Sequence, residues 1–134
     1  MYTTLFRRQH TKIREMLNSL RPSDFSAAKA YATLVKLNAT IIVHLRMEDD
    51  VLYPTLLKSA DADVREKTAR FQAEMAQLSR EFVAFCARWM KVGALGENPR
   101  VFQREWHEMV LALRERLNRE DDDLYAEFDR LRAA

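Results

Sequence analysis

The predicted fold depends on one stretch of the chain, Ile41-Ile42-Val43-His44-Leu45-Arg46-Met47-Glu48-Asp49-Asp50-Val51-Leu52-Tyr53-Pro54. Its apolar residues, together with Leu37, recur at helical spacing, which is typical of the inner face of an amphipathic α-helix. His44 and Glu48 lie four residues apart on this face, so their side chains project next to each other. An imidazole and a carboxylate aimed into a core are either two metal ligands or a buried pair that needs a further partner.

A second copy of this pattern lies 72 residues further along the chain. The segment from Arg116 to Tyr125 aligns with the segment from His44 to Tyr53, and Arg116 stands at the position of His44. The match suggests that the two halves of the molecule are related by a pseudo-two-fold axis. If they are, the difference between Arg116 and His44 bears directly on function.

The remaining apolar patterns and breaks predict four long helices with short connections. We expect helices from Thr3 or Thr4 to about Leu20, from about Phe25 to the Pro54 region, from the Ser59–Asp63 loop to Gly93 or Gly96, and from Asn98-Pro99 to about Arg130. No segment alternates with the period of a β-strand. The chain is therefore predicted to be all-α, as one domain over residues 1–134 that forms an antiparallel up-down-up-down four-helix bundle.

The composition excludes several other classes of protein. In 134 residues, 48% are hydrophobic and 31% are charged, and a net charge of +2 gives no electrostatic case for binding nucleic acid. No apolar run approaches the roughly 18 residues that a membrane span needs, and the first residues lack the apolar core of a signal peptide. A single cysteine, Cys86, excludes an internal disulfide. We expect a cytoplasmic monomer or homodimer that contacts neither nucleic acid nor membrane, with no protein partner identifiable.

Several ionisable residues share the inner faces of these predicted helices. The six are His10, His44, Glu48, Glu74, Arg116 and Glu120. If the halves are symmetric, their side chains converge on one layer of the bundle, where unpaired charges cost several kcal/mol each. They must therefore bind a metal ion or neutralise one another. Imidazole nitrogen and carboxylate oxygen suit iron, zinc or manganese.

These residues resemble the hemerythrin-like, or HHE cation-binding, family of four-helix bundles. The resemblance is carried by His10, by His44-x-x-x-Glu48 followed by Leu52-Tyr53-Pro54, and by Glu120 followed by Leu124-Tyr125. Members that match the full pattern hold a non-haem di-iron centre, so the resemblance implies a non-haem iron site with His10, His44, Glu48 and Glu120 among its ligands. It also implies a role in oxygen binding, in sensing of oxygen, nitric oxide or iron, or in metal handling.

Two departures from the family pattern alter this expectation. Arg116 stands where the fourth helix should supply a histidine, and arginine has no free lone pair for a metal. The third helix has no histidine, and Glu74 is the inward residue there that could substitute. Three glutamates and Arg116 would be neutralised by one divalent ion. We therefore predict one ion, most simply iron, with Arg116 in place of a second; Glu74 and Glu120 either bind this ion or pair with Arg116.

Three functions follow from these alternatives. The first is a metal-binding protein with a degenerate site, used in metal, oxygen or nitric oxide handling or sensing rather than in oxygen transport. The second is a metal-free bundle that acts as an interaction or regulatory module, with Arg116 bridging the buried glutamates. The third is an enzyme such as a peroxidase or oxidase, which needs a substrate cavity that the sequence does not indicate. We expect the protein not to be an enzyme.

Overall fold

The computed structural model describes residues 2–133, without the side chain of Val92, and this part of the chain is helical apart from short connections. In chain order the elements are α1 (Thr4–Ser19), the 3-10 turn η1 (Pro22–Asp24), α2 (Ala27–Met47), the π-helical turn η2 (Glu48–Leu52), α3 (Tyr53–Leu57), α4 (Ala62–Trp89), α5 (Val92–Glu97), α6 (Pro99–Arg119), the π-helical turn η3 (Glu120–Leu124) and α7 (Tyr125–Ala133). No strand occurs between residues 2 and 133, which confirms the all-α prediction.

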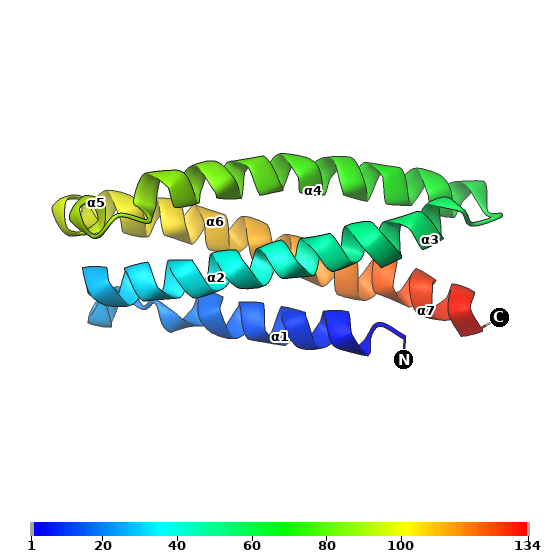
Figure 1. The fold of residues 1–134 in the computed structure, drawn as a ribbon, viewed down its shortest axis with the longest axis horizontal. Coiled ribbons are helices and arrows are strands. Elements are labelled where there is room, and N and C mark those ends of the chain that lie inside the picture. The colour runs from blue at the N-terminus through cyan, green and yellow to red at the C-terminus, as the bar shows by residue number, and fades with distance from the viewer. Residues whose placement is uncertain (1, 134) are drawn as a thin grey trace.

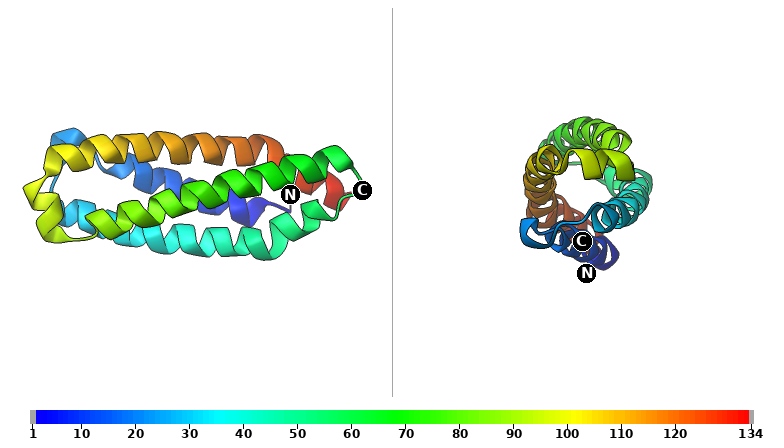
Figure 2. Two further views of the ribbon diagram at one scale, coloured as in Figure 1. Left: turned by 90° about the horizontal axis from the view of Figure 1, so that it is seen from above. Right: turned by 90° about the vertical axis from the view of Figure 1, so that its left-hand side faces the viewer.

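The elements form four long rods, because η2 joins α2 to α3 and η3 joins α6 to α7 without a break in the helical path. Successive rods run in opposite directions, and both termini lie at the same end of the molecule (Figure 1). The end-on view in Figure 2 shows the rods arranged around a common axis. None of the helices within residues 2–133 is long and apolar enough to cross a membrane.

The helix boundaries follow local capping chemistry, with one correction to the sequence prediction. Ser26 caps α2 by accepting a hydrogen bond from the Lys29 backbone N–H at 3.1 Å. The third helix was predicted to reach Gly93 or Gly96, but α4 ends at Trp89, and both glycines lie within the short helix α5. Neither glycine has a positive φ, so neither makes the left-handed turn that glycine often provides after a helix.

The two π-helical turns were not predicted from the sequence. Each begins at a glutamate of the repeated motif, at Glu48 in η2 and at Glu120 in η3. A π turn widens the helix by one residue per turn, and such turns occur frequently at functional sites. Their matching positions support the pseudo-two-fold relation between the two halves. Pro54 does not end the second rod, because it lies in the first turn of α3, where its missing N–H is tolerated.

A polar layer separates two apolar cores. The larger core contains aromatic residues that pack together near α5, among them Trp89, Phe102 and Trp106. The smaller core lies at the end that contains both termini, and it includes Tyr53 and Tyr125. Along each rod that contributes to it, the polar layer lies between residues of the larger core and residues of the smaller core. The buried residues of this layer are His10, His44, Glu48 and Glu120.

Leu113 and Leu111 on α6 provide a matched test of this packing. The Leu113 side chain is 4% exposed and belongs to the larger core, whereas Leu111 is 54% exposed. We expect Leu113→Ala to lower the free energy of unfolding by about 2–5 kcal/mol, because it removes buried methyl groups and leaves a cavity. Leu111→Ala should change it by less than about 0.5 kcal/mol. Urea denaturation followed by circular dichroism measures both; equal losses would contradict the assigned helix face.

Candidate metal centre

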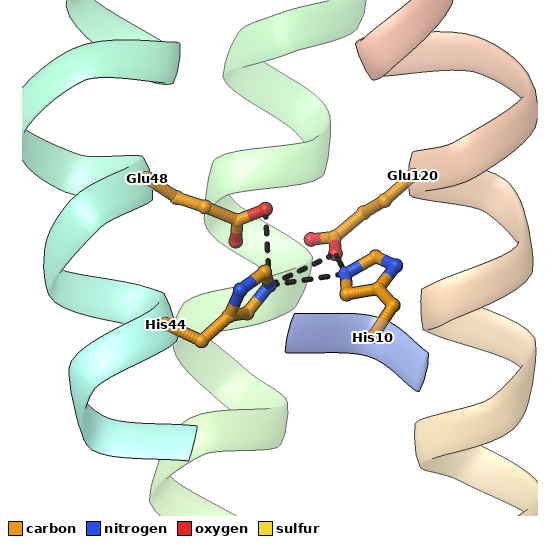
Figure 3. A group of neighbouring side chains, drawn as sticks. All are labelled: His10, His44, Glu48 and Glu120. Carbon is orange, nitrogen blue, oxygen red and sulfur yellow. Dashed lines mark hydrogen bonds and ion pairs between the residues drawn. The ribbon is translucent and has the colours of Figure 1, made fainter. Parts of the chain in front are cut away.

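Four buried side chains converge in the polar layer (Figure 3). His10 comes from α1, His44 from α2, Glu48 from η2 and Glu120 from η3, and one ligand atom of each lies within 4.8 Å of the others. Each of these residues is at most 3% exposed. The sequence predicted all four as metal ligands, and the structure brings them together.

The spacing of the ligand atoms suits one metal ion. His10 Nε2 lies 3.0 Å from His44 Nε2 and 3.0 Å from Glu120 Oε1. His44 Nε2 lies 3.3 Å from Glu48 Oε2 and 3.7 Å from Glu120 Oε1. Metal–ligand bonds of about 2.0–2.2 Å place neighbouring ligand atoms roughly 2.8–3.6 Å apart, depending on the coordination angle. The observed separations are close to this range.

Hydrogen bonds on the far side of each imidazole orient both histidines for metal binding. His10 Nδ1 lies 2.8 Å from Asp121 Oδ1, and His44 Nδ1 lies 2.6 Å from Gln9 Oε1. Both partners are oxygen acceptors, so each Nδ1 carries the proton and donates it. In the neutral ring, Nε2 is then left with its lone pair facing the centre of the cluster. This arrangement of outer acceptors is the usual support for metal-binding histidines.

Tyr125 closes the cluster on the side of the smaller core. Its hydroxyl donates to Glu48 Oε2 at 2.6 Å and lies 2.8 Å from His10 Nε2. The ring stacks on Phe6 with centroids 5.4 Å apart. Burial, followed by the charges of Glu120 and Glu48, raises the pKa of Tyr125, so the phenol keeps its proton and acts as a donor.

Both site carboxylates have one oxygen without a protein donor. Glu48 Oε1 and Glu120 Oε2 are buried and make no hydrogen bond to any described residue. A buried acceptor without a donor costs about 1–3 kcal/mol, and a charged one costs more. A cation at the centre of the cluster would satisfy this demand, and two imidazole nitrogens with two carboxylates are a suitable donor set for it. The residues present therefore fit a metal ion.

The electrostatics of the metal-free cluster favour a protonated His44. Burial acts to lower the pKa of His44, but hydrogen bonds and charges from Glu120 and Glu48 outweigh it and raise the pKa to about 9. Burial and the negative charge of Glu120 raise the pKa of Glu48. Burial acts to raise the pKa of Glu120 as well, yet hydrogen bonds from His10 and His44 hold it below its usual value. Protons thus occupy the place of a cation, and a metal ion would displace them.

Comparison with known protein families agrees with this geometry. The family model described as hemerythrin HHE cation binding domain matches residues 1–128. The chain belongs to the hemerythrin HHE family. A search of curated proteins and a search of solved structures each returned no match.

Glu74 does not lie in the hemerythrin-type site, which corrects the expectation that it points inward. Its side chain is 45% exposed on α4, where Arg116 Nη2 donates to Glu74 Oε2 at 2.5 Å and Arg119 Nη1 donates to the same oxygen at 3.0 Å. The Arg116 guanidinium also lies over the Phe71 ring, 5.1 Å from its centroid. Among the described residues no ion pair joins Arg116 to Glu48 or Glu120. The predicted pairing of Arg116 with Glu74 is therefore confirmed, whereas the predicted bridge from Arg116 to the buried Glu48 and Glu120 is wrong.

A second internal repeat shows which residues of the other half correspond to the histidine ligands of the hemerythrin-type site. When α4 is shifted by 65 residues onto α1, Phe71 falls on Phe6 and Met75 falls on His10. The first repeat, with its shift of 72 residues, places Arg116 on His44. The complete half of the site thus has two histidines, and the other half has a thioether and a guanidinium at the corresponding positions.

Three residues that support the hemerythrin-type site were not assigned to it from the sequence. The π turn η3 rotates Asp121 inward beside Glu120, and a regular helix would not present both side chains to the site. Gln9 carries no motif that marks it as a hydrogen-bond partner. Tyr125 did have a signal, because a Leu-Tyr pair follows the glutamate in both halves, and the Tyr125 hydroxyl contacts the cluster.

The raised pKa of His44 predicts how stability depends on pH when metal is removed by a chelator. Because the folded protein holds this proton more tightly than the unfolded chain, the stabilisation is complete below the ordinary value of 6.5 and is lost as pH rises through about 9. The free energy of unfolding should fall by about 1–3 kcal/mol across this window.

Denaturation at pH 6, 7.5 and 9.5 measures this change. His44→Gln should abolish most of the slope. His107→Gln should keep it, because His107 is exposed on α6. A slope that survives His44→Gln would assign the effect to another group.

Proposed function

We propose that the protein binds a single metal ion between His10, His44, Glu48 and Glu120, and that it serves in the handling or sensing of metal, oxygen or nitric oxide in the cytoplasm. The proposal rests mainly on one observation. Two Nε2 atoms and two carboxylates, each carboxylate with an unpaired oxygen, meet in a site whose four residues are at most 3% exposed. A dry cluster of this kind is stable only with a cation or with protons in its place.

The altered half of the site supports one ion rather than two. Met75 and Arg116 occupy the positions of His10 and His44, and the guanidinium cannot bind a metal. A thioether is a soft ligand that suits copper(I) better than iron, manganese or zinc. Glu48 and Glu120, when both are ionised, balance the charge of one divalent ion. A second ion would leave an excess of positive charge in the core.

Iron is the first choice of metal. The donor set of two imidazoles and two carboxylates suits iron, and it also suits zinc and manganese, which remain the alternatives. Bound iron would supply redox sensitivity and an affinity for small diatomic ligands. The chain itself contributes the orientation of the histidines through Asp121 and Gln9, and a fixed phenol donor in Tyr125.

The space beside the cluster favours sensing or storage over enzymatic conversion of an organic substrate. A cavity of about 20 Å³ lies next to His44, Glu120 and Arg116, and its other walls are apolar. This volume is about that of one water-sized molecule. We therefore propose that the protein is not an enzyme. The metal-free interaction module loses its main support, because Arg116 pairs with exposed Glu74.

Metal analysis of purified variants tests the ligand set. Protein expressed with iron supplied should contain about one ion per chain. Glu120→Gln and His44→Ala should each lower the metal affinity at least about tenfold, because mutation of the residues that merely support metal ligands already costs about that much. Glu74→Gln is the matched control and should keep its metal. Added ion should also raise the melting temperature of the wild-type protein. A metal-free wild-type protein whose melting temperature ignores iron, zinc and manganese would contradict the proposal.

The repeat predicts how a second metal position can be restored. Met75→His combined with Arg116→His places histidines at the positions that correspond to His10 and His44. We expect this double variant to bind two ions per chain, measured by elemental analysis against protein concentration. Met75→Leu with Arg116→Gln removes the same side chains without adding ligands and should still bind one. A double-histidine variant that folds and binds only one ion would refute the assigned correspondence.

A further inference from the structure

A groove of about 400 Å³ runs along the surface between the second rod and α4. Its walls include Asp49 of η2, Tyr53 of α3, and Gln72, Met75 and Ser79 of α4. Asp49 is exposed to solvent, whereas Tyr53 is 2% exposed and Met75 is 8% exposed. The groove thus extends from an acidic group at the surface to buried residues of the core.

The groove and the small cavity at the metal centre share two wall residues. Leu45 and Met75 line both the groove and the cavity that His44, Glu120 and Arg116 also line. The groove and the cavity therefore adjoin each other at these two side chains. Methionine is unbranched and has three rotatable bonds, so it moves aside more readily than other core residues.

The opposite side of the bundle, between α1 and the fourth rod, is covered at the corresponding place. There Arg14 Nη2 donates to Asp121 Oδ2 at 2.6 Å, and Arg7 Nη2 donates to the Asp121 carbonyl oxygen at 3.2 Å. The repeat places Ser79 at the position of Arg14, Gln72 at that of Arg7 and Asp49 at that of Asp121. The side of the bundle between the second rod and α4 thus lacks both arginines, and Asp49 stays exposed beside the groove.

We propose that this groove is the route by which metal cations enter and leave the buried centre, with Asp49 attracting the ion at the mouth and Met75 acting as the gate. The inference rests on the proposed metal-binding function. It gives the altered half a role: the substitutions that remove the second metal position also open a path to the first. An acidic group in a cleft raises the local concentration of cations and speeds their association.

A gate on the route makes a specific kinetic prediction. Closing the path slows entry and exit by the same factor, so the rates change and the dissociation constant does not. The loss of a ligand, in contrast, changes the dissociation constant. The repeat supplies the variant that closes the path, because Ser79→Arg grafts the residue found at position 14 onto the altered half, within reach of Asp49.

The experiment uses metal-free protein and Co²⁺ as the probe. Uptake is followed by stopped-flow measurement of the cobalt visible absorbance, and release is followed after addition of excess EDTA. We expect Ser79→Arg to slow both rates by about tenfold, the lower range of electrostatic effects on association, with the dissociation constant within about twofold of wild type. Gln77→Arg adds the same charge at an exposed position of α4 outside the groove and should leave both rates unchanged. Met75→Ala should speed both rates by enlarging the gate.

Each outcome decides a separate point. Slower uptake and release in Ser79→Arg with a constant affinity supports the route. Unchanged rates in folded Ser79→Arg and Met75→Ala overturn it while the metal site stands. Equal slowing by Gln77→Arg also overturns it, because net charge alone would then account for the effect. A wild-type protein that binds no Co²⁺ at saturation overturns the proposed function, and the route with it.

Discussion

The rest of the structure depends on the burial of two imidazoles and two carboxylates in one dry layer. His10, His44, Glu48 and Glu120 lie between two apolar cores, and no described protein group reaches Glu48 Oε1 or Glu120 Oε2. Charges in such surroundings need a counter-charge, which must be a metal ion or protons. The outer hydrogen bonds of Asp121 and Gln9 decide how the histidines meet this demand, because they turn both Nε2 atoms toward the centre.

The repeated architecture explains how the layer is assembled and why it is asymmetric. Each half contributes a first helix, a second helix with a π turn at its glutamate, and a tyrosine that follows. The π turns supply the extra width that lets Asp121 support His10 while Glu120 faces the centre. Met75 and Arg116 interrupt this symmetry. The guanidinium of Arg116 turns toward exposed Glu74 and the Phe71 ring, so the altered half contributes no metal ligand to the cluster apart from Glu120.

Much of this arrangement could be predicted from the sequence, because the decisive signals are periodic. The spacing of apolar residues gave the four rods, and the histidine–glutamate spacing placed His44 and Glu48 on one inner face. Glu74 was misplaced because a residue at the border of an apolar stripe can face the core or a neighbouring rod, and periodicity does not decide between them. The π turns were not predicted because one extra residue per turn leaves no mark in composition. The partner of Arg116 depends on how two rods pack, which a single sequence does not contain.

The central claim is that one metal ion lies between four named ligands and that Arg116 and Met75 exclude a second. Anomalous diffraction from crystals of the iron-loaded protein, recorded at the iron edge, tests it most directly. The account predicts a single peak about 2.0–2.2 Å from the Nε2 atoms of His10 and His44 and bound by Glu48 and Glu120. Two peaks in the layer, or a single peak bound through Glu74 on the surface, would contradict it.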